Sequence, residues 1–568
     1  MAGFGSFSFT GLIRALILFS ILAYQQNIAN ATNAAKATNN YRRATSPVVG
    51  DLILSNGKIY TMNSGGDVSS VLAIQDGVIV YIGESESEAI DKFATAPKIV
   101  DLQGRTAIPG LIDCHNHLVL LGNRPGYHTP LENAYSIADV QNTYRTRAAA
   151  IPQGSFITTI GGFHPNQFAE TRLPTLSELD SAVPDNPVFI SYGFTGPAVT
   201  NTPGKSFFSA LPDPPVISAD GSIAFGTDNG KALLALRQEF LTPETRQRAV
   251  KDAMSYAASL GVTTHLDQGA FPATGTPSDG AAHEDLYTMH LPWLSVYDNM
   301  DGIVRLRINH LHMDSTPEVP TVVQRLLNTF KFFGNTMVRT GGIGEFITTD
   351  YAGGPVFTEA ATRIAQAGWR LEVHSLTGSD YMTQIQTFEG INANLTGGIQ
   401  DLRWVVAHVP LITTEYLQRL KALGGGVNLS GWQYLAGTSP ASGPPFKDIL
   451  ASGIPAGMGG DGMQIAPLNP FIHLYYATTG LNALGNQINS GQQIGRMDAL
   501  RLYTSKNQWF LGGEDEGLLG SLEVGRLGDV VVLNGDYFTV QDEELKGLRA
   551  SLTVVGGKVV HDDGSLGI

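Results

Sequence analysis

The centre of the chain alternates short apolar runs with helical stretches, and this alternation constrains the fold more than any other feature. Helices are predicted over 244–260, 358–368 and 413–423, where apolar residues recur at three- and four-residue spacing. The strand candidates around them end near His115, His265, His310, Lys331, His374, His408, Ser430 and Gly460. Eight strands alternating with helices predict an α/β fold, a (β/α)8 TIM-like barrel.

Two β-rich segments flank this centre. Residues 51–107 contain the hairpin signals Asn56-Gly57 and Asp76-Gly77 between alternating apolar residues, and residues 519–568 have the same texture. Together they predict one small β-sandwich built from both ends of the chain. The expected organisation is a signal peptide (1–31), a disordered leader (32–50), the sandwich (51–107 with 519–568) and the barrel (108–518) with an insertion at about 123–240.

Composition narrows the choice of protein class. The chain has 568 residues, 43% of them hydrophobic, which is enough for a large buried core. The 36 Lys and Arg against 51 Asp and Glu give a net charge of −15, so nucleic-acid binding is not expected. Cys114 is the single cysteine, which excludes an intrachain disulfide and a Cys-rich zinc module.

The amino terminus is typical of an export signal. Arg14 precedes the apolar run from Ala15 to Tyr24, and Ala29-Asn30-Ala31 matches a small-x-small cleavage site. The run is shorter than the roughly 20 residues that a membrane span needs. We therefore expect a secreted or periplasmic protein without a membrane span after cleavage; the alternative is an anchor through residues 12–24.

Several polar residues stand where strand candidates end. His115 and His117 close an apolar strand, and because side chains alternate along a strand, both point to the same side. His310 and His312 repeat this spacing, so the His-x-His spacing alone is weak evidence for a metal site. His374, His408 and Asp461 follow further strands, and in a barrel these ends converge on the face that carries active sites. Each histidine taken alone could instead cap its strand.

Such a set of ligands has a coherent chemistry. Histidine nitrogen and carboxylate oxygen suit zinc, with manganese or iron as alternatives. A bound ion lowers the pKa of its water to about 7 and polarises a scissile carbonyl. Asp461 has a carboxylate, which can take a proton from the metal-bound water to leave a metal-activated hydroxide. The same carboxylate can then deliver that proton to a leaving nitrogen.

The chain resembles the amidohydrolase superfamily, and within it the amidohydrolase 3 group, from about Asp51 to Ile568. The resemblance rests on PGLIDCHNHL (109–118), on GSLEVGRLGDVVVLNGD (520–536) with VVGGKVV (554–560), and on the ordered His-x-His, Lys, His, His, Asp series. It implies two metal ions: His115, His117 and Asp461 hold the first, His374 and His408 hold the second, and Lys331, carboxylated by CO2, bridges them.

The resemblance has one departure and several softer implications. Gly334-Asn335 stands where the group has Asp-Gly after its lysine, and His310 is a rival ligand. Relatives are commonly homodimers, although the sequence indicates no interface. Relatives also carry a histidine near 191–196, where this chain offers Tyr192 or Phe194 instead. The expected substrate contacts are His164, His265, Asp267 and Trp432, while Cys114 is expected to be buried packing.

The sequence therefore predicts a metal-dependent hydrolase of a non-peptide C–N bond in a small-molecule amide, N-acyl or N-formyl amine, or cyclic amide. A deaminase or lactonase with a mononuclear site, which does not need Lys331, is the nearest alternative. The non-enzyme alternative is a secreted binding protein on an inactive hydrolase scaffold. A nucleotide-binding or serine-hydrolase reading has no support, because Gly-x-Gly-x-x-Gly, Walker and Gly-x-Ser-x-Gly motifs are absent from the sequence.

Overall fold

The computed structural model describes residues 52–193, 196–271, 285–436 and 443–568. The expected signal peptide and leader lie outside these residues, as does Phe194. Among the helices of the described residues, none combines the length and the apolar character that crossing a membrane requires.

The centre of the chain forms two parallel four-stranded sheets, in the orders β16-β15-β14-β8 and β17-β18-β19-β20. Hydrogen bonds connect their outer strands: Ile343 N donates to Arg370 O (2.9 Å), and Asp461 N donates to His115 O (2.8 Å). The strands are β8 (Leu111–Asn116), β14 (Val262–Asp267), β15 (Arg305–His310), β16 (Val338–Ile343), β17 (Glu372–Val373), β18 (Val405–Ala407), β19 (Gly426–Ser430) and β20 (Ala456–Gly459).

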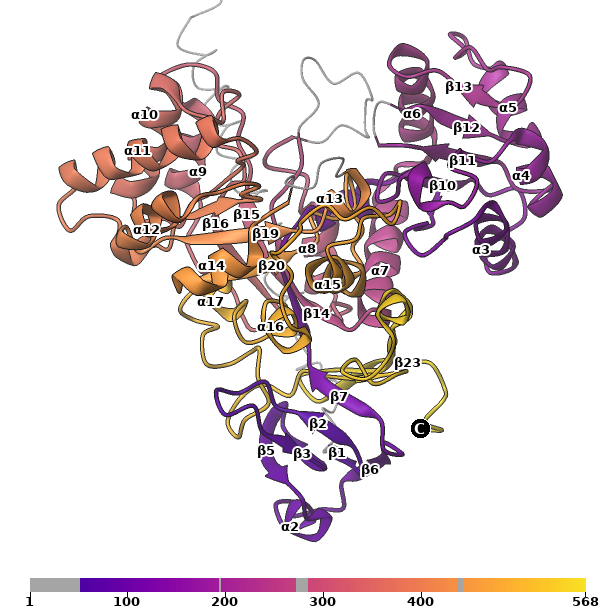
Figure 1. Ribbon diagram of the computed structural model, residues 1–568. Coiled ribbons are helices and arrows are strands. Elements are labelled where there is room, and N and C mark those ends of the chain that lie inside the picture. The colour runs from indigo at the N-terminus through magenta and orange to yellow at the C-terminus, as the bar shows by residue number, and fades with distance from the viewer. Residues whose placement is uncertain (1–51, 194–195, 272–284, 437–442) are drawn as a thin grey trace, which may run out of the picture. The chain divides into compact units, whose positions relative to one another are not determined.

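Helices separate these strands along the chain (Figure 1). The three helices predicted from the apolar spacing are confirmed as α7 (Pro243–Ser259), α10 (Gly354–Gln366) and α12 (Thr414–Ala422). The others in this part are α8 (Leu291–Asp298), α9 (Pro320–Asn328), α11 (Gly378–Asn394), α13 (Gln433–Ala436), α14 (Phe446–Ser452), α15 (Pro470–Thr479), α16 (Arg496–Arg501) and α17 (Gln508–Leu511).

The predicted fourth strand is wrong. Residues 329–337 connect α9 to β16 and form a turn in which Phe333 N donates to Thr340 Oγ1 (2.8 Å) and Thr340 N donates to Phe333 O (2.9 Å). Phe330 and Phe333 are 76% and 69% exposed, so this apolar run does not enter the core. The fourth strand is β16, and it ends just before Gly344 and Glu345.

Both ends of the chain contribute to one six-stranded sheet, in the order β23-β22-β21-β7-β2-β3. Figure 1 shows the indigo β7 beside the yellow C-terminal strands, and Val531 pairs with Ile108 in antiparallel register. A four-stranded sheet β5-β4-β1-β6 shares a buried apolar cluster with it, which includes Leu54, Ile74 and Val530. The elements are β1 (Leu52–Ser55), β2 (Lys58–Tyr60), β3 (Val68–Ser69), β4 (Val71–Gln75), β5 (Val78–Gly83), α2 (Glu86–Ile90), β6 (Lys98–Asp101), β7 (Thr106–Pro109), β21 (Val530–Leu533), β22 (Ala550–Val555) and β23 (Lys558–Asp562).

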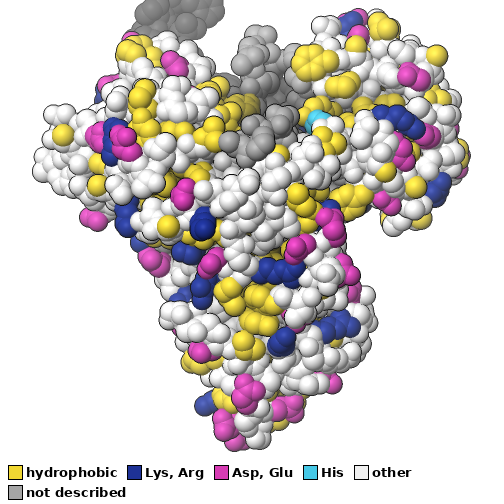
Figure 2. All heavy atoms as spheres, viewed as in Figure 1, with side chains coloured by type: hydrophobic (Ala, Val, Ile, Leu, Met, Phe, Trp, Pro, Cys, Tyr) yellow, Lys and Arg dark blue, Asp and Glu magenta, His cyan; other side chains and the backbone are white. Residues whose placement is uncertain are grey.

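The insertion after β8 has a sheet and cores of its own. Phe156, Phe189 and Phe208 pack in one of these cores. The insertion reaches the loop that follows Asp461, because Gly162 N donates to Gln464 O (3.1 Å). Its sheet order is β13-β12-β11-β10-β9, and its elements are β9 (Tyr127–His128), α3 (Ile137–Ala149), β10 (Ile157–Ile160), α4 (Leu176–Ala182), β11 (Val188–Ser191), β12 (Ala198–Thr200), α5 (Thr202–Ser209), β13 (Ser222–Ile223) and α6 (Thr227–Phe240). On the face drawn in Figure 2, acidic and basic side chains are interspersed among apolar and neutral ones.

Gly459 allows β20 to approach β8. A Cβ atom at this position would lie 2.4 Å from His115 N and 2.6 Å from His115 O, and backbone atoms cannot yield without moving a strand. We expect Gly459→Ala to lower the free energy of unfolding by about 1–3 kcal/mol, as overpacking does. Gly390→Ala is the control: it lies in α11 with open space around it, and should be neutral or stabilising by up to about 1 kcal/mol. Urea unfolding measures both, and equal stability of the two variants would contradict the close contact.

Candidate metal centre

Four histidines and two carboxylates meet at the carboxyl ends of the central strands. Glu345 lies in the middle of them: its Oε2 is 3.1 Å from His115 Nε2 and 3.0 Å from His408 Nε2. His117 Nε2 is 3.3 Å from Asp461 Oδ1. The residues are His115 at the end of β8, His117 just after it, Glu345 after β16, His374 after β17, His408 after β18 and Asp461 after β20. This set, named here the six-residue cluster, is buried, with only the His374 side chain 14% exposed.

Two overlapping groups in the cluster have the spacing of metal ligands. His115, His117 and Asp461 form one, and His115, Glu345 and His408 form the other, with donor atoms within 4.8 Å of one another in each group. Glu345 belongs to the second group and also lies beside the first, because its Oε1 is 3.5 Å from His117 Nε2. One carboxylate therefore faces both groups, and its Oε2 is also 3.4 Å from His374 Nδ1.

Local backbone conformation contributes to this convergence. His408 and Asp461 have φ values of 66° and 55°, in the left-handed region that non-glycine residues seldom adopt. Such conformations cost of order 1–3 kcal/mol each, and they concentrate at functional sites. Asp113 supports the turn before Asp461, because its Oδ1 accepts hydrogen bonds from His115 N and Gly460 N (3.1 Å each).

The imidazole rings are oriented by their second nitrogen. His115 Nδ1 contacts Glu372 Oε1 (2.6 Å), and His117 Nδ1 donates to Gly269 O (2.7 Å). His408 Nδ1 lies 2.9 Å from Ser430 Oγ. In all three rings Nε2 is the atom left to face the cluster, and the buried His115 Nε2 makes no hydrogen bond to any residue that the structure describes. Imidazoles oriented in this way, together with two carboxylates, fit a divalent metal ion.

The electrostatics of the cluster favour added positive charge. Burial lowers the pKa of His115, but Glu345 and Glu372 outweigh it and raise that pKa well above the usual value. For His117, burial is likewise outweighed by Asp461 and Glu345, and the pKa rises to about 10. The histidines in turn hold the pKa of Glu345 well below its usual value, against the effect of burial. The same negative field that favours protons in these rings attracts a divalent cation, which then replaces those protons.

Lys331 does not belong to the cluster, and its predicted role as a carboxylated bridge is wrong. Its side chain is on the surface, where Nζ donates to Gly368 O (2.8 Å). The physical reason is the misplaced fourth strand: Lys331 lies in the turn before β16, whereas Glu345 follows the strand's carboxyl end. The sequence carried a signal for Glu345, since a carboxylate directly after the apolar run Gly341-Gly-Ile-Gly resembles the position of Asp461.

His265 and Asp267 lie on β14, and both have polar partners within the protein. Asn116 Nδ2 lies 2.8 Å from His265 Nδ1. Asp267 accepts a hydrogen bond from Val119 N (2.8 Å) and contacts His290 Nε2 (2.7 Å). Both carboxylate oxygens of Asp267 are thereby used within the protein, so its predicted substrate contact has no support in this geometry.

The remaining predicted residues lie outside the two ligand groups. His164 is half-buried, accepts a hydrogen bond from Asn166 N and packs edge-on against Tyr192. Trp432 is partly buried, and its Nε1 has no hydrogen-bond partner among the described residues. His310 is buried with a ring 6.1 Å from that of His290. Cys114 is buried, and Asn428 Nδ2 lies 2.9 Å from its sulfur.

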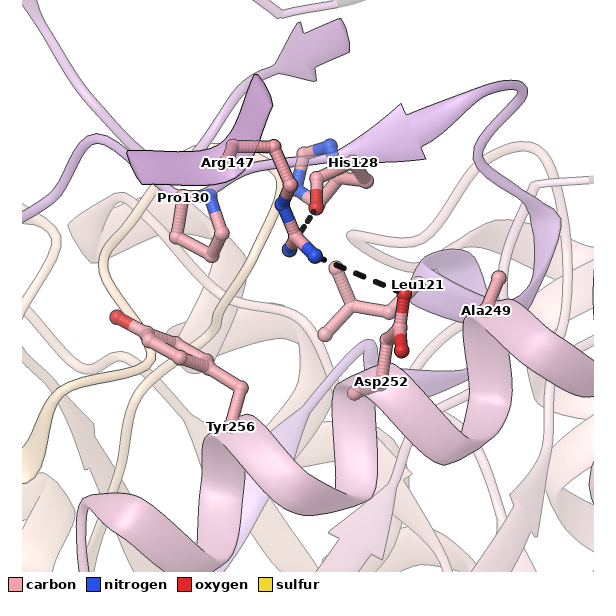
Figure 3. Close-up of a pocket in the computed structure, with 8 residues that line it drawn as sticks. Leu121, His128, Pro130, Arg147, Ala249, Asp252 and Tyr256 are labelled. Carbon is pink, nitrogen blue, oxygen red and sulfur yellow. Dashed lines mark hydrogen bonds and ion pairs between the residues drawn. The ribbon is translucent and has the colours of Figure 1, made fainter. Parts of the chain in front are cut away.

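A small cavity of about 40 Å³ lies between α7 and the start of the insertion (Figure 3). Arg147 Nη1 and Asp252 Oδ2 face one another there at 4.0 Å. The cavity has room for about one or two water molecules. Its lining contains no member of the six-residue cluster and consists of Leu121, His128, Pro130, Arg147, Ala249, Asp252, Ala253 and Tyr256.

Tyr256, beside this cavity, donates a hydrogen bond to the buried Glu132. Burial raises the pKa of Glu132 to about 7, although the hydrogen bonds from Tyr256 and Leu468 N oppose this. Because the folded pKa exceeds the unfolded one, Glu132 stabilises the fold below about pH 4.5, and this contribution is lost as the pH rises through about 7. Relative to Glu132→Gln, which cannot ionise, the wild type should lose roughly 2–3 kcal/mol between pH 5 and pH 8. Urea unfolding at both pH values measures this, and parallel pH profiles would contradict it.

Comparison with known proteins assigns the chain to a family. The amidohydrolase family model matches residues 98–561, so the chain belongs to the amidohydrolase family, as its motifs predicted. It is an enzyme of the class that hydrolyses C–N bonds other than peptide bonds. N-substituted formamide deformylase of Arthrobacter pascens is 22% identical over 559 residues, which cover 90% of this chain and 98% of that protein. The protein LONG AFTER FAR-RED 3 of Arabidopsis thaliana is 28% identical over 250 residues, 42% of each chain.

Solved structures show the same mixed α/β fold. A metal-dependent hydrolase of Pyrococcus horikoshii has a TM-score of 0.57 at 18% identity, over 87% of this chain and 99% of that one. An atrazine chlorohydrolase of Arthrobacter aurescens, complexed with zinc and atraton, has a TM-score of 0.53 at 17% identity, over 90% and 95% of the two chains. At this identity the likeness establishes the fold.

Proposed function

We propose that the chain hydrolyses a non-peptide C–N bond of a small-molecule amide, N-acyl or N-formyl amine, or cyclic amide, with two divalent ions held by the six-residue cluster. The convergence of the cluster around Glu345 carries this proposal. Full-length similarity to N-substituted formamide deformylase supports the choice of substrate class. Zinc is the proposed metal, with manganese or iron as alternatives, because imidazole and carboxylate ligands suit all three.

Each residue of the cluster has a proposed role. His115, His117 and Asp461 would hold the first ion and His374 and His408 the second, with Glu345 between them in the place predicted for Lys331. When bound, the ions supply a water of lowered pKa and polarise the scissile carbonyl. Asp461 would serve as the general base and acid, the group that moves a proton to the leaving nitrogen. Burial raises the pKa of Asp461, but His408 and His117 outweigh burial and lower that pKa, which keeps the carboxylate ionised as a ligand and proton acceptor.

The finer architecture is also a proposal. We propose that the two parallel sheets form one (β/α)8 barrel over residues 108–518, which the hydrogen bonds between their outer strands support. The two sheets from the chain ends, over 51–107 and 519–568, are proposed to form a β-sandwich around their shared apolar cluster. Residues 1–31 are proposed to direct export to the periplasm or the exterior. If the mature chain is found to begin at Thr32, export is supported. If it retains residues 12–24, the anchor is supported instead.

Metal analysis joined to an amide screen tests the function. The purified chain is stripped with a chelator and reloaded with zinc, and amine release from N-formyl amines, N-acyl amines and cyclic amides is followed. About two ions per chain with zinc-dependent amine release is the expected result. About one ion, with ammonia release or lactone opening instead, supports the mononuclear deaminase or lactonase. A chain without metal or turnover is the binding-protein outcome and overturns the proposal.

A further inference from the structure

We propose that Glu372 is a positioning residue, which holds the His115 ring so that Nε2 is presented as a metal ligand. This inference rests on the proposed metal centre. Glu372 Oε1 lies 2.6 Å from His115 Nδ1, and both side chains are fully buried. Glu372 begins β17 and His374 directly follows it, so one short segment carries both a proposed ligand and the support of another ligand.

The second oxygen of Glu372 also has hydrogen-bond partners. Gln268 Nε2 donates to Glu372 Oε2 (3.0 Å), and Arg370 Nη2 lies 3.4 Å from the same oxygen. Gln268 is fixed in turn, because its Oε1 accepts a hydrogen bond from Asn309 Nδ2 (2.9 Å). Glu372 is thus surrounded by hydrogen-bond donors, and an ionised carboxylate is the group that can accept from all of them.

This arrangement decides which nitrogen of His115 is available to a metal ion. With Nδ1 engaged by Glu372, Nε2 is the nitrogen that points into the cluster, 3.1 Å from Glu345 Oε2. A carboxylate partner also makes the imidazole a stronger ligand, and the loss of such a partner typically weakens metal binding by about 10- to 100-fold.

Glu372→Gln is the direct test, with Glu132→Gln as the matched control. An amide has one acceptor and one donor group, whereas a carboxylate has two acceptors. In Glu372→Gln the new amide NH2 must therefore face another hydrogen-bond donor, either His115 Nδ1 or the side chains of Gln268 and Arg370. Glu132 is equally buried and accepts from Tyr256 and Leu468 N, without contact to the cluster. Zinc affinity by competition with a chromophoric chelator should fall about 10- to 100-fold for Glu372→Gln and stay within about twofold for Glu132→Gln. Absorption of the cobalt-loaded protein should change for Glu372→Gln alone.

A charge swap keeps the test decisive if Glu372→Gln fails to fold. The double variant Gln268→Glu with Glu372→Gln restores complementary hydrogen bonds. It moves the negative charge from position 372, which contacts His115, to position 268, which is one hydrogen bond further from His115. It should fold and bind zinc more tightly than Glu372→Gln, yet more weakly than the wild type. Wild-type zinc affinity in a folded Glu372→Gln protein, or in the swap, would overturn the inference. If the wild type itself binds no zinc, the proposed function fails instead.

Discussion

Replacing His115, His117 or Asp461 by Ala is expected to lower turnover on the order of 10³-fold or more, while the chain stays folded. The three side chains are at most 4% exposed, and they form one of the two groups with metal-ligand spacing. Removing one of them takes away a donor that no neighbouring group replaces. Turnover of a hydrolysed amide and zinc content are measured together, with circular dichroism to confirm the fold.

His561→Ala is the matched control for these variants. His561 lies on β23, where Nε2 contacts Ala550 O (3.1 Å) in the sheet made from both chain ends. It should keep wild-type zinc content and turnover. Near wild-type activity in any of the three site variants, with normal activity in His561→Ala, would remove that residue from the centre.

Glu345→Ala is expected to lower turnover on the order of 10²-fold or more and to release about one metal ion per chain. Glu345 faces both ligand groups, so its loss leaves His115 and His408 without their shared carboxylate. A short carboxylic acid such as formate, added with zinc, should partly restore activity by occupying the vacated position. Metal content by mass spectrometry and turnover with and without formate are the measurements.

Lys331→Ala separates the two candidate bridges. Lys331 is exposed and contacts Gly368 O, so its removal should change neither metal content nor turnover. The opposite pattern, with metal lost in Lys331→Ala and retained in Glu345→Ala, would restore the carboxylated lysine and contradict the geometry of the cluster.

Local sequence signals were sufficient to predict a member of the six-residue cluster where a polar residue directly follows an apolar strand. His115, His374, His408 and Asp461 each follow an apolar run, and the alternation of strands and helices predicts that such endings meet. The same reasoning failed for Lys331, because an apolar run rich in phenylalanine was taken for a strand although it forms an exposed turn. Glu372 gave no signal at all, since its role depends on His115, which lies 257 residues away.

The sequence by itself determined the amidohydrolase family, the three helices and most strand endings, because these follow from local periodicity and from contiguous motifs. Only the tertiary structure decided that Glu345 rather than Lys331 joins the histidines and that Glu372 supports His115. It also decided that the carboxylate oxygens of Asp267 already contact Val119 N and His290 Nε2. The physical reason is that hydrogen-bond partners and shared ligands depend on distances between strands, and these distances are fixed by packing rather than by spacing along the chain.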